Sequence, residues 1–166
     1  MFEGRGPQQE TIAIATSCLE AVRDLDGKIE KFGQSYRARA RRMASMVYET
    51  GLLSTIAYLY AKATKDTYEK VVKANMPGTG RMDPQVLRNE QGKLPRNEEL
   101  AHAAYLNHIL AYISSKLGRD GQEKDPIGLV KTLAENPVEL GVAESLLRPF
   151  LIELKHLAEA VLEAEE

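Results

Sequence analysis

The chain has very little of what would place it in a specialised class of protein. Its single cysteine, Cys18, cannot form an internal disulfide, and it excludes a zinc site built from several cysteines. Its formal net charge is −2, so no overall basic excess indicates nucleic acid. The longest run without Asp, Glu, Lys, Arg or His, Thr50 to Ala61, has twelve residues. A membrane-spanning helix needs about 20 apolar residues, so we expect no membrane partner.

We also expect no export signal. The first residues lack a basic segment of the kind that opens such signals, and the apolar stretch from Ile12 to Leu19 lies behind Glu10. Together with the lone thiol, this favours a cytoplasmic protein. The 166 residues are 43% hydrophobic and 28% charged, as is typical of a soluble globular chain. We therefore expect one domain over residues 1–166.

The hydrophobic pattern is helical almost throughout, without the alternating runs that indicate strands. It predicts an all-α protein, a compact bundle of about six helices with no sheet. Gly33 is expected to end the first helix, Ser35 to cap the second, and Pro149 to kink or split the last. The expected helices cover approximately residues 9–31, 36–50, 52–73, 98–117, 126–135 and 137–164. The caps expected for the later helices are Asn97, Asp125 and Asn136.

Residues 75–96 form the one long irregular segment of the pattern. The segment is polar and contains several glycines and prolines, so we expect an exposed loop, either mobile or partner-binding, with one helical turn capped at Asp83-Pro84. Its sequence Gly78-Thr79-Gly80-Arg81 has two glycines, but no strand precedes it and no Gly-Lys-Ser/Thr follows. We interpret it as a turn and not as a phosphate-binding loop.

Two Glu-x-x-His sequences have the spacing that di-iron carboxylate bundles use on two of their helices, Glu99 to His102 and Glu153 to His156. At about 100° per residue, Glu99 and His102 fall on the apolar face of their helix, and His156 falls nearly opposite the apolar stripe of its own. Only one of the two Glu-x-x-His pairs directs its side chains inward, so the sequence does not predict a metal site shared by four helices. We expect no metal and no cofactor, and a metal-dependent bundle oxidase is a third hypothesis only.

No part of the sequence indicates catalysis. Cys18 lies on a helix next to the apolar stripe, where a buried and inert thiol is expected. No hydrolytic or phosphoryl-transfer motif is present. We expect a non-enzyme, with no catalytic residue and no small-molecule substrate.

Charge is distributed unevenly along the chain. Residues 28–42 contain six positive residues and one negative residue, a local net charge of +5, whereas residues 153–166 have a local net charge of −4. In the predicted helix, Arg37 and Arg41 lie on one flank of the apolar stripe. Arg39 and Arg42 lie on the other. All four can extend their guanidinium groups around the buried stripe into solvent.

An arginine-rich helix face of this kind suits a polyanion. Guanidinium groups match phosphate oxygens in geometry, and each phosphate that is neutralised releases counterions. The segment is a candidate surface for following a nucleic-acid backbone without reading its bases. Two alternatives remain open. One is a solvated face that pairs with acidic residues on a neighbouring element or on another copy of the chain. The other is a helical protein–protein adaptor whose basic face docks an acidic partner.

The sequence Tyr36-Arg37-Ala38-Arg39-Ala40-Arg41-Arg42 is followed, after a spacer, by residues 51–63, which begin with Gly-Leu-Leu and end in Ala-Lys-Ala. This pattern resembles the small subunit of the type III-B CRISPR effector, the Cmr complex. Residues 105–113 resemble the middle helix of that family, and residues 154–160 resemble its last helix. The likeness covers most of residues 35–74 and 97–162.

The resemblance implies a non-catalytic helical subunit in antiviral defence that stacks as a short filament inside the crRNA-bearing complex. It implies that the partners are other Cmr effector subunits, copies of the chain itself, and the backbone of the target RNA on its crRNA. Arg41 and Arg42 match the basic pair of the family. Lys62 matches the lysine of Ala-Lys-Ala, and Lys155 matches a basic position of the last helix. The charge pattern adds Arg37 and Arg39. The expected RNA-binding residues are thus Arg37, Arg39, Arg41, Arg42, Lys62 and Lys155.

Overall fold

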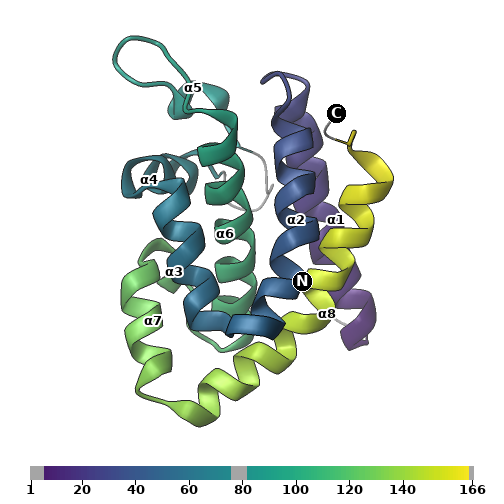
Figure 1. Cartoon of the computed structure of the whole chain (residues 1–166), viewed down its shortest axis with the longest axis vertical. Coiled ribbons are helices and arrows are strands. Elements are labelled where there is room, and N and C mark those ends of the chain that lie inside the picture. Colours follow the sequence, from purple (N-terminus) through teal and green to yellow (C-terminus); the bar gives the residue numbers. More distant parts are fainter. Residues whose placement is uncertain (1–5, 76–81, 165–166) are drawn as a thin grey trace.

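The computed structural model describes residues 6–75 and 82–164, and these residues form eight α-helices and one short 3₁₀ helix (Figure 1). They contain no strand, only an isolated bridge between Asn75 and Met82. The expected all-α class is confirmed, but the expected number of about six helices is too low. The elements are α1 (Pro7–Asp26), α2 (Phe32–Thr50), α3 (Leu52–Ala63), α4 (Lys65–Ala74), α5 (Pro84–Leu87), α6 (Asn97–Lys116), η1 (Gln122–Lys124), α7 (Pro126–Ala134) and α8 (Pro137–Val161).

One additional helix arises because the segment expected as a single helix divides at Thr64. This residue has φ 68° and ψ 150°, which lie outside the helical region. Its hydroxyl accepts a hydrogen bond of 3.3 Å from the backbone N–H of Thr67 and so caps α4. A β-branched residue at positive φ is rare, and the apolar pattern continues across the break. For these two reasons the sequence predicted one helix where there are two.

The other additional helix, α5, is a single turn in the segment expected as a loop. Asp83 caps it, as anticipated, by accepting a hydrogen bond from the backbone N–H of Gln85 at 3.0 Å. Met82 and Leu87 are buried, whereas residues 88–93 are exposed. Residues 76–81, which include the Gly78-Thr79-Gly80-Arg81 sequence, lie outside the described residues.

The junction of α1 and α2 differs from its expected form. Gly33 lies inside α2, and its backbone N–H donates a hydrogen bond of 2.7 Å to Oδ1 of Asp26, the last residue of α1. Asp26, not Ser35, therefore supplies the hydrogen-bond acceptor for a free backbone N–H group at the start of α2. A Cβ atom on Gly33 would lie 2.8 Å from this carboxyl group, so a side chain at this position would displace the carboxylate. Asn97 likewise does not cap its helix, because its side chain donates to the backbone oxygen of Glu30 at 2.7 Å.

α6 is the central helix of the bundle (Figure 1). It packs against α2 and α8 on one side and against α3 and α4 on the other, and α1 packs against α2 and α8. Apart from the half-buried Ala111, every residue from Leu100 to Ser114 is buried. A helix that is buried on all faces belongs at the centre of a bundle.

The apolar stripes expected for the first two helices form part of the core. Their buried members are Ala15, Leu19, Val22, Ile29, Tyr36, Ala40, Met43 and Val47. Ile12, which was assigned to the same stripe, is an exception with 42% exposure. Because the stripe of α2 faces inward, the helical period directs most of its arginines away from the core.

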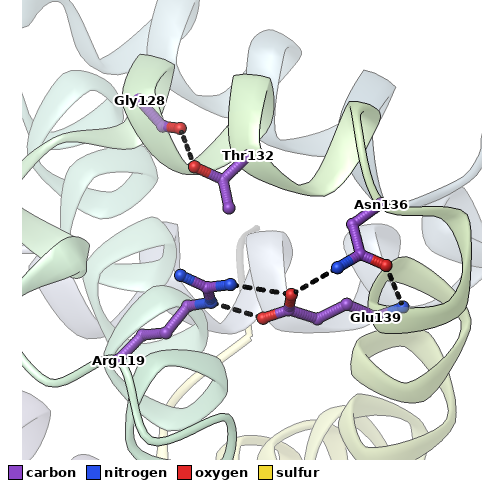
Figure 2. Close-up of polar contacts among 5 residues, drawn as sticks. All are labelled: Arg119, Gly128, Thr132, Asn136 and Glu139. Carbon is purple, nitrogen blue, oxygen red and sulfur yellow. Dashed lines mark hydrogen bonds and ion pairs between the residues drawn. The ribbon is translucent and has the colours of Figure 1, made fainter.

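The start of α8 is fixed by a group of polar contacts (Figure 2). As expected, the side-chain oxygen of Asn136 caps the helix by accepting a hydrogen bond from the backbone N–H of Glu139 at 3.2 Å. The Glu139 carboxylate accepts hydrogen bonds from the Asn136 amide and from two nitrogens of Arg119, with Nη2 at 2.8 Å. The bonds with Arg119 lower the pKa of Glu139 and raise the pKa of Arg119. They tie the end of the α6 region to the beginning of α8.

Pro149 lies inside α8, which continues as one helix through it. The helix changes direction along its course (Figure 1), as is usual where proline removes a bond from the helical ladder. The predicted alternative of a split is therefore not observed. The second half of α8 carries Lys155 and Glu159 next to α2.

Candidate nucleic-acid interface

A groove of about 710 Å³ lies on the outer face of α2 and is also lined by one residue each of α3 and α8. We call it the α2 groove. Its cationic residues are Arg39, Arg41, Arg42 and Lys155, and the others that line it are Ala38, Met43, Ser45, Met46, Glu49 and Tyr58. Four of the six cations expected from the sequence therefore meet in one depression, although Lys155 is far from the arginines along the chain.

The three arginines of the α2 groove have different surroundings. Arg39 is half-buried, and its Nη1 lies 3.1 Å from Nε2 of His102. Arg41 has a side chain that is 60% exposed and forms an ion pair with Glu159, with Nε and Oε1 3.3 Å apart. Arg42 is exposed and forms no ion pair with any residue in the described ranges. Arg42 is thus the arginine most available to an external anion.

The two expected lysines come from two different helices that pack against α2. Lys155 of α8 is half-buried and lines the α2 groove directly. Lys62 of α3 is exposed, and its Nζ lies 5.8 Å from the ring centroid of Tyr58, which lines the groove. Lys62 therefore stands at the α3 margin of the groove and not within it.

Arg37 is the expected residue that the structure does not bring into the groove. It is half-buried, and its Nε is buried without a hydrogen bond to any residue that the structure describes. The sequence placed Arg41 with Arg37 on one flank of α2, whereas Arg41 lines the groove together with Arg39 and Arg42. It could not show that the flank of Arg37 is partly covered.

Three residues of the region were missed as site residues. Tyr58 precedes Lys62 by one helical turn, so its position beside the expected lysine could have been inferred from spacing. His102 was considered only as a metal ligand. Glu159 belongs to the acidic end of the chain, but its contact with Arg41 within the same molecule is long-range and leaves no signal in a single sequence. For Arg41, the structure thus agrees with the alternative in which acidic residues of a neighbouring element pair with the basic face.

Two buried histidines and the half-buried Cys18 thiol are kept in their neutral forms. Burial lowers the pKa of His108 to about 4, and its Nδ1 lies 2.7 Å from the hydroxyl of Tyr36. Burial also lowers the pKa of His102. Burial raises the pKa of the Cys18 thiol to about 12, as befits an unreactive cysteine.

The residues considered as metal ligands have other surroundings. Glu99 forms an ion pair of 3.3 Å with Arg96, His102 contacts Arg39, and His156 is exposed. Within residues 6–75 and 82–164, no three or more His, Cys, Asp and Glu side chains gather in a way that could hold a metal ion. In the same ranges, no helix has the length and apolar character needed to cross a membrane.

The fold and the groove define a small all-helical protein with a concentrated cationic surface on one helix. The chain belongs to the CRISPR-associated Cmr5 family, whose sequence profile (Cas_Cmr5) matches residues 8–139. It is 26% identical over 147 residues to the CRISPR system CMR subunit Cmr5 of Saccharolobus solfataricus, a match that covers 81% of this chain and 83% of the relative. The family indicated by residues 35–74 and 97–162 is thereby confirmed.

Two solved structures contain chains with the same fold. One, in the type III-B Cmr-beta complex bound to non-cognate target RNA, superposes with a TM-score of 0.70 at 19% identity and covers 97% of this chain and 99% of its own length. The other, in the Cmr-beta complex bound to cognate target RNA and AMPPnP, has a TM-score of 0.61 at 22% identity. It covers 92% of this chain and 97% of its own length. At these identities the likeness establishes the fold.

Proposed function

We propose that the chain is a non-catalytic small subunit of a type III-B Cmr complex in the cytoplasm, and that its α2 groove follows the phosphate backbone of target RNA without reading the sequence. The observation that carries the proposal is the meeting of Arg39, Arg41 and Arg42 with Lys155 in one groove. That two chains of the same fold come from complexes bound to target RNA supports it.

The chemistry of the groove fits such a role. A complex that uses exchangeable guides must accept any guide–target duplex, so a subunit along it has to recognise geometry and charge instead of bases. Arginine forks bind phosphate oxygens in pairs, and the released counterions favour binding to any sequence. The proposed partners are accordingly the target RNA with its crRNA, the other Cmr subunits, and further copies of this chain.

The test is a charge reversal at two cations of the groove, one from α2 and one from α8. Arg42→Glu combined with Lys155→Glu should lower the affinity of the assembled complex for target RNA, by roughly tenfold for each phosphate that the groove can no longer bind. The matched control is Lys65→Glu with Lys131→Glu, which reverses two exposed lysines of α4 and α7 outside the groove. Equal affinities of the two double variants would refute the proposal, provided that native mass shows intact assembly.

The alternative of a protein–protein adaptor is favoured by one contact. Arg41 already binds the carboxylate of Glu159, so the groove can accept acidic side chains as well as phosphates. If partner subunits are captured equally well after nuclease treatment, and are released on reversal of Arg42 and Lys155, the groove is an acidic-partner docking surface.

A further inference from the structure

His102 of α6 is a buried histidine with a partner at each ring nitrogen. Its Nδ1 lies 2.6 Å from the backbone oxygen of Glu98, and its Nε2 lies 3.1 Å from Nη1 of Arg39. Only 4% of His102 is exposed. Because Arg39 lines the α2 groove, His102 connects the central helix of the bundle to one cation of the groove.

The chemistry of these two partners determines which ring nitrogen carries the proton. A guanidinium group offers only donors, so Nε2 must accept the hydrogen bond from Arg39 through its lone pair. A backbone carbonyl only accepts, so Nδ1 must donate to Glu98. Both bonds exist together only in the neutral imidazole with its proton on Nδ1. A second proton would direct a ring N–H at an N–H of Arg39 and break that hydrogen bond.

The surroundings of His102 favour the neutral form. Burial is the largest cause that lowers its pKa, and the charges of Arg39 on α2 and Lys62 on α3 lower it further, against opposing effects of Glu98. The ring of Tyr58 on α3 packs edge-on against the imidazole, with centroids 6.1 Å apart. Contacts from α2, α3 and its own helix therefore surround the imidazole.

We propose that His102 is a positioning residue of the α2 groove, which holds the Arg39 guanidinium at the α3 side of the groove for contact with an RNA phosphate. The inference rests on the proposed function, since it requires an anion in the groove. A free arginine side chain loses rotamer freedom on binding, which weakens affinity. A guanidinium already held by His102 has given up that freedom beforehand, and four of its five N–H donors remain for the ligand.

The first experiment measures the affinity of the assembled complex for a labelled RNA complementary to its guide. His102→Leu should weaken binding roughly two- to tenfold, the effect of freeing one long side chain, and should add little to the weakening caused by Arg39→Ala. His102→Gln should restore most of the affinity, because its side-chain oxygen can accept the bond from Arg39. Equal weakening in His102→Leu and His102→Gln would overturn the proposal.

The second experiment is ¹⁵N NMR of the imidazole nitrogens in the full-length chain, which does not depend on RNA. At pH 7 we expect a protonated Nδ1 and an unprotonated Nε2 in His102, and a shift of the Nε2 signal in Arg39→Ala. A proton on Nε2 would overturn the proposal.

The outcomes separate this inference from the proposed function. If Arg39→Ala and the reversal of Arg42 and Lys155 weaken RNA binding while folded His102→Leu does not, the groove keeps its role and the inference about His102 is wrong. If none of these changes weakens binding, both are wrong.

Discussion

The carboxylate of Glu144 in α8 accepts a hydrogen bond of 3.0 Å from the backbone N–H of Leu52, the first residue of α3. Gly51 precedes it with φ 88° and has no side chain to cap the helix. A carboxylate from a distant helix thus takes the place of an N-cap, where the helix dipole also favours negative charge. The contact fixes the α2–α3 junction against α8, and these three helices line the α2 groove.

Removal of this carboxylate should destabilise the protein. Glu144→Ala is expected to lower the free energy of unfolding by about 1 kcal/mol, because the first turn of α3 loses its cap. Urea unfolding measures the change, with Glu20→Ala as the control, since Glu20 is an exposed carboxylate on α1. If the two variants are equally stable, the hydrogen bond from Leu52 to Glu144 contributes nothing to the fold.

The burial of His108 should make stability depend on pH. His108 has a pKa of about 4 when folded, against an ordinary value of 6.5, so the unfolded chain binds more protons between these values. Stability from this group is fully present above pH 6.5 and is lost as the pH falls toward 4, by up to about 3 kcal/mol. Urea unfolding from pH 7 to pH 4.5 checks this.

The control for the pH dependence is the double variant Tyr36→Phe with His108→Leu, which removes both polar groups together and leaves neither unpaired. Its stability should vary less with pH than that of the unaltered chain. The same pH dependence in both proteins would mean that other groups are responsible.

Two glycines in helices should respond in opposite ways to alanine. In Gly33→Ala, the new Cβ would displace the Asp26 carboxylate and break its 2.7 Å bond to the Gly33 N–H, which should cost about 1–2 kcal/mol. Gly141 lies inside α8 with nothing within 4 Å of an added Cβ, so Gly141→Ala should stabilise the protein by roughly 0.5–1 kcal/mol. Thermal unfolding of both variants measures the difference, and stabilisation by Gly33→Ala would contradict the role of Asp26 as a cap.

The ion pair between Arg41 and Glu159 should restrain the groove. Glu159→Gln frees the Arg41 guanidinium, so RNA affinity of the assembled complex should rise severalfold. Stability should change little, because an exposed ion pair contributes about 0–1 kcal/mol. Glu163→Gln makes the same change of charge at an exposed residue that does not line the groove. An equal rise in both variants would indicate a general charge effect, with no specific release of Arg41.

Local features of the fold could be predicted where the signal is local. The caps at Asp83, Asp125 and Asn136 follow from side chains that reach a backbone N–H two or three residues later. The start of α2 depends instead on the Asp26 carboxylate, and the break at Thr64 on a strained backbone, neither of which changes the apolar period. The break at Thr64 is one of the two reasons why the expected number of helices was too low.

The candidate site could be predicted only in part, because only some of its features depend on local sequence. The helical period directs Arg39, Arg41 and Arg42 outward, but it does not reveal which neighbours they meet. The approach of Lys155, the ion pair with Glu159 and the hydrogen bond to His102 all come from α6 and α8, which pack against α2 through long-range contacts. Such pairings depend on the tertiary structure and cannot be read from the pattern of one sequence.

The most direct test of RNA-backbone binding by the α2 groove is the salt dependence of affinity. For the assembled complex, the logarithm of the RNA-binding constant is measured against the logarithm of salt concentration, with and without Arg42→Gln and Lys155→Gln. The slope should become shallower by about one unit for each phosphate that is no longer neutralised, equally for RNAs of unrelated sequence. An unchanged slope would contradict a phosphate-binding role for the groove.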